Sequence, residues 1–281
     1  MRYFPSRGAS LAGQLAELWE YRELLWMFVL RDIKIRYRQV QVGVAWCLLQ
    51  PTLGMLIFLG IFWLVKARPT DASDRYASAA AVVFLGLLVW QFVSAAIRDA
   101  TGVLVNYRHV ITKIAFPRFC LPAASVVCAA FDACVAATIF PVLILFTGDD
   151  VAWTTLPLVI LPLALLAIFS LGVAAWTSSL NAFYRDVGFA LPFALQVGMF
   201  ASPVIYDSSQ VRGNESLPQW FKTFYAANPV ASGIDWVRSL TLGGPTPDLL
   251  PTAIAIAITA AAFVSGMWWF RHSDRRLADR I

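Results

Sequence analysis

The chain has 281 residues, of which 59% are hydrophobic and only 14% are charged, and its mean hydropathy is +0.67. This balance excludes an ordinary soluble domain and indicates a protein of the lipid bilayer. The formal net charge of +5 does not indicate nucleic-acid binding, because a multi-pass membrane protein collects Lys and Arg in its cytoplasmic loops for topological reasons alone. The four cysteines lie in or beside apolar runs without the close pairs of a zinc site, so neither a metal site nor a disulfide framework is predicted.

Residues 1–42 lack the apolar core of a signal peptide and are expected to remain in the mature protein. Apolar residues recur in this stretch at helical spacing, and they are Leu11, Leu15, Leu18, Leu25 and Val29, with Trp19 and Trp26 beside them. The pattern predicts an amphipathic helix in the membrane interface, where tryptophan is enriched. The alternative is a soluble helix that packs on a partner.

A basic segment, Arg31–Gln39, precedes the first apolar run, Gly43–Val65. The run contains no charged residue and no histidine, and as a helix it would reach roughly 34 Å, enough to cross a hydrocarbon core of about 30 Å. Cations beside a first span hold that flank in the cytoplasm. The amino terminus is therefore predicted to be cytoplasmic.

Five more apolar runs follow, at residues 77–97, 119–146, 156–180, 188–205 and 249–270. The basic segment 98–118 is too polar to span and is predicted to be a cytoplasmic loop, whereas the acidic turn 148–150 is predicted to be external. Of the 22 Lys and Arg residues, 16 fall in segments assigned to the cytoplasmic side. This asymmetry predicts six spans with both termini inside. Pro51 and Pro192 are expected to bend the first and fifth spans.

Residues 206–248 are rich in apolar residues but are bounded by Pro and Gly, which predicts half-length helices that enter the membrane and return. The predicted fold is thus an all-α integral membrane protein with six transmembrane helices, an N-terminal interfacial amphipathic helix, and re-entrant helices between spans 5 and 6. It forms a single transmembrane domain over 1–281. This domain consists of a cytoplasmic interfacial and gate segment (1–42), a six-span bundle (43–270) and a cytoplasmic tail (271–281).

The sequence contains no motif for nucleotide hydrolysis or for catalysis. Each of its four lysines follows a residue other than Gly, so the phosphate-binding P-loop is absent, and HExxH, GxSxG and CxxC are absent as well. The two histidines, His109 and His272, lie in different predicted segments. No catalytic residue and no cofactor are therefore predicted for this chain, and an integral-membrane transferase would have no visible active site.

Asp132 is the one carboxylate well inside a predicted span. An acid within a membrane is a candidate functional group. The alternative is a buried hydrogen bond between helices, and this is what we expect, because no basic partner is predicted within the spans.

Aromatic and amide side chains recur inside the spans and are predicted to line a substrate path; they are Trp46, Gln50, Trp90, Phe189, Phe193, Gln196 and Phe200. Aromatic rings stack on the C–H faces of sugars, and amides bond to their hydroxyl groups. The alternative for each residue is packing in the core or against lipid.

A set of short motifs appears in a fixed order along nearly the whole chain. They are WEYRELL at Trp19–Leu25, RDIKIRYRQ at Arg31–Gln39, GxxWxxxQP at Gly43–Pro51, KIAFPR at Lys113–Arg118, LNAFYRDV at Leu180–Val187, SPVIY at Ser202–Tyr206, and NP at Asn228. In these motifs and in its length the chain resembles the permease subunit of bacterial ABC exporters of O-antigen, capsular and teichoic-acid polysaccharides.

The resemblance implies a homodimeric permease that works with two copies of a separate ATPase subunit, which binds ATP and Mg. It implies transport of a lipid-linked polysaccharide across the bacterial inner (plasma) membrane. Residues expected to contact the ATPase are Asn106, Arg108, Lys113, Phe116 and Arg118 in one loop, with Arg185 and Asp186 in a second. The gate beside the lipid head group is expected at Arg31, Lys34, Arg36, Tyr37 and Arg38.

The cations of this gate are placed to attract a pyrophosphate head group. Their alternative role is to set the orientation of the first span and nothing more. Other functions also stay open at this stage. A secondary transporter would need an ion-coupling cluster, an exporter of drugs or small lipids would share the architecture, and a membrane scaffold would need no path.

Overall fold

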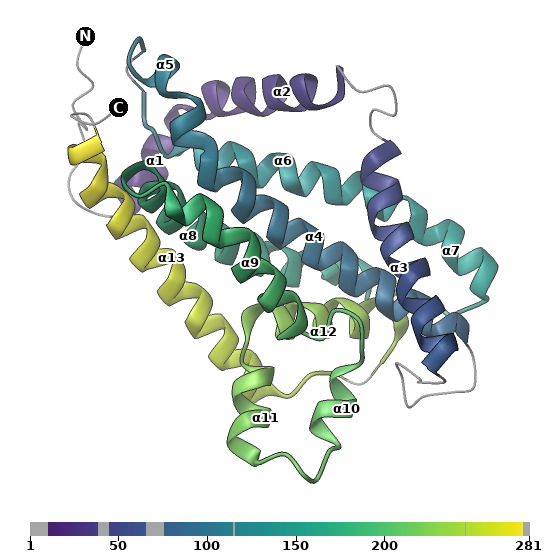
Figure 1. The fold of residues 1–281 in the computed structure, drawn as a ribbon. Helices are drawn as coiled ribbons and strands as arrows, with labels where there is room; N and C mark the ends of the chain where they lie inside the picture. The colour runs from purple at the N-terminus through teal and green to yellow at the C-terminus, as the bar shows by residue number, and fades with distance from the viewer. Residues whose placement is uncertain (1–10, 39–44, 66–75, 115, 245, 278–281) are drawn as a thin grey trace.

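The computed structural model describes residues 11–38, 45–65, 76–114, 116–244 and 246–277, and within these ranges all regular structure is helical. The helices lie side by side in one bundle, with α1 beside the C-terminal end of α13 (Figure 1). In chain order they are α1 Leu11–Glu20, α2 Arg22–Arg38, α3 Ala45–Val65, α4 Tyr76–Asn106, α5 Arg108–Ile111, α6 Cys120–Ala137, α7 Ile139–Thr147, η1 Leu156–Val159, α8 Ile160–Phe183, α9 Asp186–Phe200, α10 Ser208–Arg212, α11 Gln219–Ala226, α12 Pro229–Leu242 and α13 Leu249–Leu277.

Five helical segments of the described chain are long and apolar enough to cross a membrane: Ala45–Val65, Ala79–Asn106, Cys120–Thr147, Leu156–Phe183 and Leu249–Asp274. These confirm a multi-pass membrane protein. The remaining predicted span is the shorter helix α9, whose 15 residues reach about 22 Å. It ends before Ser202, because the residue that precedes a proline, here Pro203, disfavours helical geometry. The sixth span thus stays a prediction.

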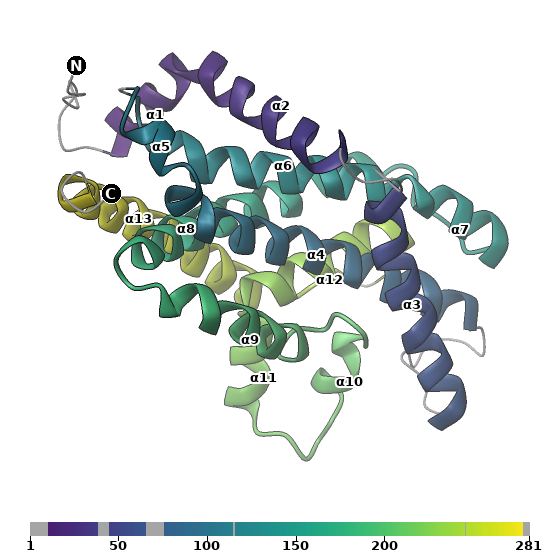
Figure 2. The ribbon, with the colours of Figure 1, turned by 45° about the horizontal axis from the view of Figure 1, so that its top comes forward.

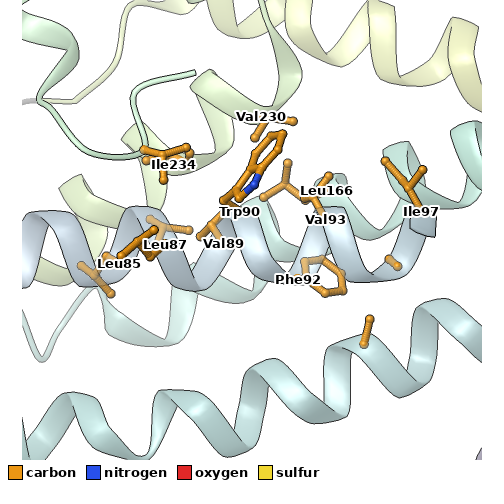
Figure 3. Close-up of a cluster of buried hydrophobic side chains, with 14 of the residues drawn as sticks. Leu85, Leu87, Val89, Trp90, Phe92, Val93, Ile97, Leu166, Val230 and Ile234 are labelled. Carbon is orange, nitrogen blue, oxygen red and sulfur yellow. The ribbon is translucent and has the colours of Figure 1, made fainter. Parts of the chain in front are cut away.

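Helix α4 is the centre of the bundle. It packs against α3, α6, α8 and α12, and 78% of its most apolar stretch is buried. Figure 3 shows its side chains, Trp90 and Val93 among them, meeting Leu166 of α8 together with Val230 and Ile234 of α12. So apolar a stretch belongs inside a bundle.

Helices α8 and α13 make the most extensive helix pair, because glycines let their backbones meet. A Cβ atom added at Gly172 would lie 2.7 Å from the backbone of Ala262, and one added at Gly266 would lie 2.2 Å from the carbonyl oxygen of Gly172. Close approach of this kind is typical of helices that pair in membranes. Beside the contact, the rings of Trp176 and Trp269 stack with centroids 4.8 Å apart.

The C-terminal end of α4 corrects one boundary predicted from the sequence. Residues from Arg98 onward were expected in a loop, yet the helix continues to Asn106. Its polar groups find partners inside the bundle, since Thr101 Oγ1 lies 2.7 Å from the Ile97 oxygen and 2.7 Å from Thr177 Oγ1 of α8. Because α4 extends to Asn106, Asp99 lies on a helix and not in a loop. The predicted tail is likewise helical as far as it is described, because α13 runs on to Leu277.

The amphipathic N-terminal segment forms two helices, α1 and α2, with a break at Tyr21. Helix α2 lies along α6 in both ribbon views (Figures 1 and 2) and buries Phe28 and Val29 against it and its neighbours. Trp19, Trp26 and Ile35 remain exposed. The interfacial location of this segment stays a prediction, and the turn into the first span at 39–44 lies outside the described residues.

Between α9 and α13 the described residues form three short helices, none long enough to span. Helix α12 is capped by Asn228, whose side chain accepts a hydrogen bond from Val230 N, and it stops at Gly243, which has a φ of 70°. The buried guanidinium of Arg238 donates to the carbonyl oxygens of Val82, Val204 and Tyr206 at 2.8–3.0 Å. Entry of these helices into the membrane stays a prediction.

Candidate functional site

A cavity of about 650 Å³ opens where α2, α3, α4 and α6 meet. Four charged side chains line it, Arg36, Arg98, Asp99 and Asp132, together with uncharged polar groups and one indole ring. The remaining lining residues are Tyr37, Trp46, Cys47, Gln50, Leu88, Gln91, Phe92, Ser94, Ala95, Ala129, Ala133 and Ala136. A concave site with a few convergent polar groups is the usual form of a ligand-binding site.

The charged cluster and the neighbouring Tyr37 together join four helices at one wall of this cavity. Arg36 on α2 donates from Nη2 to Asp99 Oδ2 on α4 at 2.7 Å, and from Nη1 to Asp132 on α6. The neighbouring Tyr37 hydroxyl donates to the other oxygen of Asp132 and lies 2.8 Å from Cys47 Sγ on α3. Helix α2 is thus fixed to the bundle by two adjacent side chains.

The pKa values of Arg36 and Tyr37 are both raised, so both side chains keep their protons. Burial alone would lower the pKa of Arg36, but the charges of Asp99 and Asp132 outweigh burial and raise it. Burial and the hydrogen bond to Asp132 raise the pKa of Tyr37, so its hydroxyl keeps its proton. The positive charge of Arg36 is therefore balanced by the carboxylates of Asp99 and Asp132.

The expected hydrogen bond of Asp132 between helices is confirmed, but its partner was missed. No basic residue was expected within reach, because Arg36 is 96 residues away in sequence and was assigned to the membrane surface. Asp99 was assigned to a loop, so no local pattern placed it beside Asp132. Only the packing of α2 along α6 brings these groups together.

Two groups of predicted residues meet in the cavity. Arg36 and Tyr37 come from the predicted gate, and Trp46 and Gln50 from the predicted substrate path. Gln91, Ser94 and Arg98 were not singled out from the sequence, because they lie among apolar residues or at a presumed loop boundary. One signal was available: Gln91, Ser94 and Arg98 recur at helical spacing on one face of α4.

The other predicted path residues lie elsewhere. Phe189 is 84% exposed and Phe193 is 72% exposed on the outer face of α9, which also carries Gln196 and Phe200. Trp90 is buried in the core, where a Cβ atom added at Gly198 would lie 3.0 Å from its ring. The cavity thus contains part of the predicted path, and the exposed face of α9 contains most of the rest.

The remaining gate cations divide into two kinds. Lys34 and Arg38 are exposed and form no ion pair with another described residue. Arg31 instead lies over the ring of Tyr107, 4.1 Å from its centroid, and 3.6 Å from Asp32. The guanidinium of Arg31 therefore contributes to packing at the junction of α2 and α5.

The loop predicted to contact an ATPase has a buried half and an exposed half. Phe116 is buried against Phe28 of α2, with ring centroids 5.3 Å apart, and Arg118 binds Asp274 of α13 at 2.9 Å. Asn106, Arg108 and Lys113 are exposed. The first pair anchors the loop, and the other three present a polar, basic surface.

Three hydrogen bonds fix the parts of this end of the molecule to one another. The Tyr107 hydroxyl donates to Asp32, and burial together with Asp32 raises the pKa of Tyr107. Asn181 donates to the Thr101 oxygen of α4 at 3.0 Å and accepts from Gly188 N at 3.0 Å. The elbow with exposed Arg185 and Asp186 is therefore held beside the end of α4 that leads into α5.

Comparison with known proteins gives consistent results over most of the chain. The family model described as ABC-2 type transporter matches residues 23–242. The O-antigen export system permease protein RfbA of Myxococcus xanthus is 26% identical over 267 residues, which cover 94% of this chain and 98% of the relative. The protein of the same name from Klebsiella pneumoniae is 26% identical over 227 residues, 79% of this chain and 81% of the relative.

Proposed function

Because the chain belongs to the ABC-2 type transporter family, we propose that it is the membrane-spanning subunit of an ATP-driven exporter of lipid-linked polysaccharide of the O-antigen type. The observation that carries this proposal is the end-to-end similarity to a relative named as an O-antigen export permease, which covers 94% of this chain. The cargo would pass from the cytoplasmic to the outer face of a bacterial inner membrane, with both termini of the chain in the cytoplasm.

The energy would come from a separate subunit. The chain has no P-loop, so ATP and Mg would bind to two copies of a partner ATPase. The exposed Arg108 and Lys113 of the first loop and Arg185 of the elbow supply the docking surface. Because the elbow is bonded to α4 through Asn181, both contacts belong to one end of the bundle.

A second copy of the chain would complete the path. Only 11% of the most apolar stretch of α3 is buried in one chain, and Ile57, Trp63, Phe189 and Phe193 are large exposed hydrophobic residues of α3 and α9. We place the second copy against these two helices, with the aromatic face of α9 along the shared passage. Pro51 and Pro192 both lie inside helices, and the bends expected there would suit helices that surround a passage.

Fewer of the gate cations are available to bind a head group than the sequence predicted. Arg36 is neutralised by two carboxylates and Arg31 lies on an aromatic ring. Lys34 and Arg38 remain as exposed cations for a pyrophosphate group. Replacing both with Gln should reduce export while leaving insertion and dimer formation unchanged, whereas normal export in that variant would remove the head-group role.

Deletion of the gene tests the proposed function. The expected result is loss of surface polysaccharide with lipid-linked glycan retained inside the cell, and recovery when the chain is restored together with its ATPase. The second candidate is an exporter of drugs or small lipids, which the apolar exposed faces would also suit. Unchanged surface polysaccharide, with newly acquired sensitivity to a small amphiphile, would favour this second candidate and overturn the first.

A further inference from the structure

We infer that the cavity between α2, α3, α4 and α6 is a binding site for a neutral sugar ring, held within one copy of the chain and separate from the cations that receive the lipid phosphate. This inference rests on the proposed function and names the part of the substrate that this cavity would take. It is carried by the charge balance of the cavity, by its unused hydrogen-bonding groups and by its exposed indole ring.

The charge balance disfavours an anion. The cavity has two cations, Arg36 and Arg98, and two carboxylates, Asp99 and Asp132. Arg36 bonds to both carboxylates, and Arg98 Nε lies 3.5 Å from Asp99 Oδ1. A pyrophosphate would have to separate a partly buried pair and would then face two carboxylates, which is unfavourable. A hydroxylated, uncharged ligand meets no such repulsion.

The polar groups that remain match the hydroxyl groups of a sugar. Within the described residues, the side-chain amides of Gln50 and Gln91 make no hydrogen bond, although both line the cavity. Each amide offers two donors and an acceptor, and each carboxylate has more lone pairs than Arg36 and Tyr37 occupy. Hydroxyl groups both donate and accept, so one ring can satisfy all of these groups.

Trp46 supplies the apolar face that a pyranose ring needs. It lines the cavity and is 58% exposed, and its indole makes no hydrogen bond to a described residue. The C–H face of a sugar stacks on an aromatic ring while its edge bonds to neighbouring polar groups. The volume of about 650 Å³ falls in the range of roughly 300–1,000 Å³ typical of small-molecule sites.

The place of the cavity fits the order of groups in a lipid-linked glycan. Asp99 lies about 10 Å along α4 from its end at Asn106, and Trp46 is the second residue of α3, so the cavity is near one end of the bundle. Helix α2 forms its wall with Arg36 and bears Lys34 and Arg38 on its exposed surface. A pyrophosphate at these exposed cations would present the first sugar to the cavity.

Protection of Cys47 from a maleimide tests the inference in membranes that contain the full permease and its ATPase, washed free of ATP. Cys47 lines the cavity, whereas Cys134 is exposed outside it and serves as the internal control. Mass spectrometry would follow both residues in membranes from cells that make the lipid-linked glycan, from cells unable to make the glycan, and from the latter after addition of polyprenyl pyrophosphate.

We expect slower labelling of Cys47 only where the glycan is present, about threefold slower if the glycan is at twice its dissociation constant, with Cys134 unchanged. Gln91→Leu should abolish the protection, and Gln219→Leu, an exposed glutamine far from the cavity, should not. If Gln91→Leu prevents folding, Ser94→Ala is the second variant.

Equal protection by polyprenyl pyrophosphate alone would overturn the inference, because the cavity would then bind the phosphate. Equal labelling of Cys47 in all three membranes would also overturn it. In either case, export that still depends on the chain in living cells would leave the proposed function intact. If the proposed function itself were wrong, cells that lack the chain would still export the polysaccharide.

Discussion

The guanidinium of Arg36 on α2 and the carboxylate of Asp132 on α6 form an ion pair between residues 96 apart in sequence, and Asp99 on α4 completes it. A residue expected at the membrane surface thus holds the only acid expected inside a span. The arrangement fixes α2 to the bundle and gives the cavity a wall with balanced charges.

Removing the cation of this cluster should destabilise the chain. Arg36→Gln leaves two partly buried carboxylates without their partner, and we expect a loss of about 1–3 kcal/mol in the free energy of unfolding. The measurement is the Tm of the purified complex in lipid nanodiscs. Lys34→Gln, an exposed cation on the same helix, is the matched control and should change stability by less than about 0.5 kcal/mol.

An apolar replacement of the whole cluster separates charge from packing. Combining Arg36→Met with Asp99→Leu and Asp132→Leu should recover most of the lost stability, because no charge is then left unpaired. A single Arg36→Gln variant with the Tm of the parent would contradict the structural role of the cluster.

The proposed docking surface predicts that reversing its charge weakens binding of the ATPase. Arg108→Glu combined with Lys113→Glu reverses two exposed charges in the first loop, and we expect the apparent Kd for the ATPase to rise by about tenfold, or about 1.4 kcal/mol. Co-purification and titration of the ATPase measure the effect. Lys222→Glu on α11 should leave association unchanged, and an unchanged Kd in the double variant would place the docking surface elsewhere.

The contact between α8 and α13 predicts intolerance of a single methyl group. Gly172→Ala would place a Cβ atom 2.7 Å from the backbone of Ala262, so we expect a loss of about 1–3 kcal/mol. Gly60→Ala on α3 meets nothing within 4 Å and should have no destabilising effect. Equal Tm values for the two variants would mean that the helices separate more easily than their packing indicates.

The hydrogen bond of Tyr107 to Asp32 predicts a dependence of stability on alkaline pH. The pKa of Tyr107 is raised in the folded chain above its unfolded value of about 10. Its contribution is therefore fully present below about pH 10 and is lost as the pH rises toward the folded pKa. The Tm of Tyr107→Phe should fall less between about pH 9 and pH 11 than that of the parent. Tyr184→Phe, at an exposed tyrosine, should follow the parent, and parallel curves for all three proteins would contradict the prediction.

The all-helical fold followed from the sequence because spans are specified by length and apolarity alone, as Ala45–Val65 illustrates. The predicted end of α4 was wrong for a physical reason. Thr101 and Asp99 are polar but are satisfied by partners on α8 and α2, and no local signal reveals such partners. Polarity was therefore mistaken for a loop.

The candidate site was predictable only in its components. Trp46 and Gln50 were selected because their chemistry suits sugars, and Arg36 because it belongs to a basic motif, but their convergence in one cavity depends on how α2 packs. Gln91 was overlooked, because its helical spacing with Ser94 and Arg98 crosses the boundary at which a loop was expected. Long-range packing decides such sites, and periodicity reports only on the face of a single helix.

The hydrogen bonds of Arg238 can form only late in the synthesis of the chain. It bonds to carbonyl oxygens at Val82 and Val204, which precede it by 156 and 34 residues. Both acceptors are therefore synthesised before their donor, Val82 on α4 and Val204 in the segment that follows α9. Until residue 238 emerges, water or the insertion machinery must occupy those oxygens, so the final closure of this end of the bundle is a late step of biosynthesis.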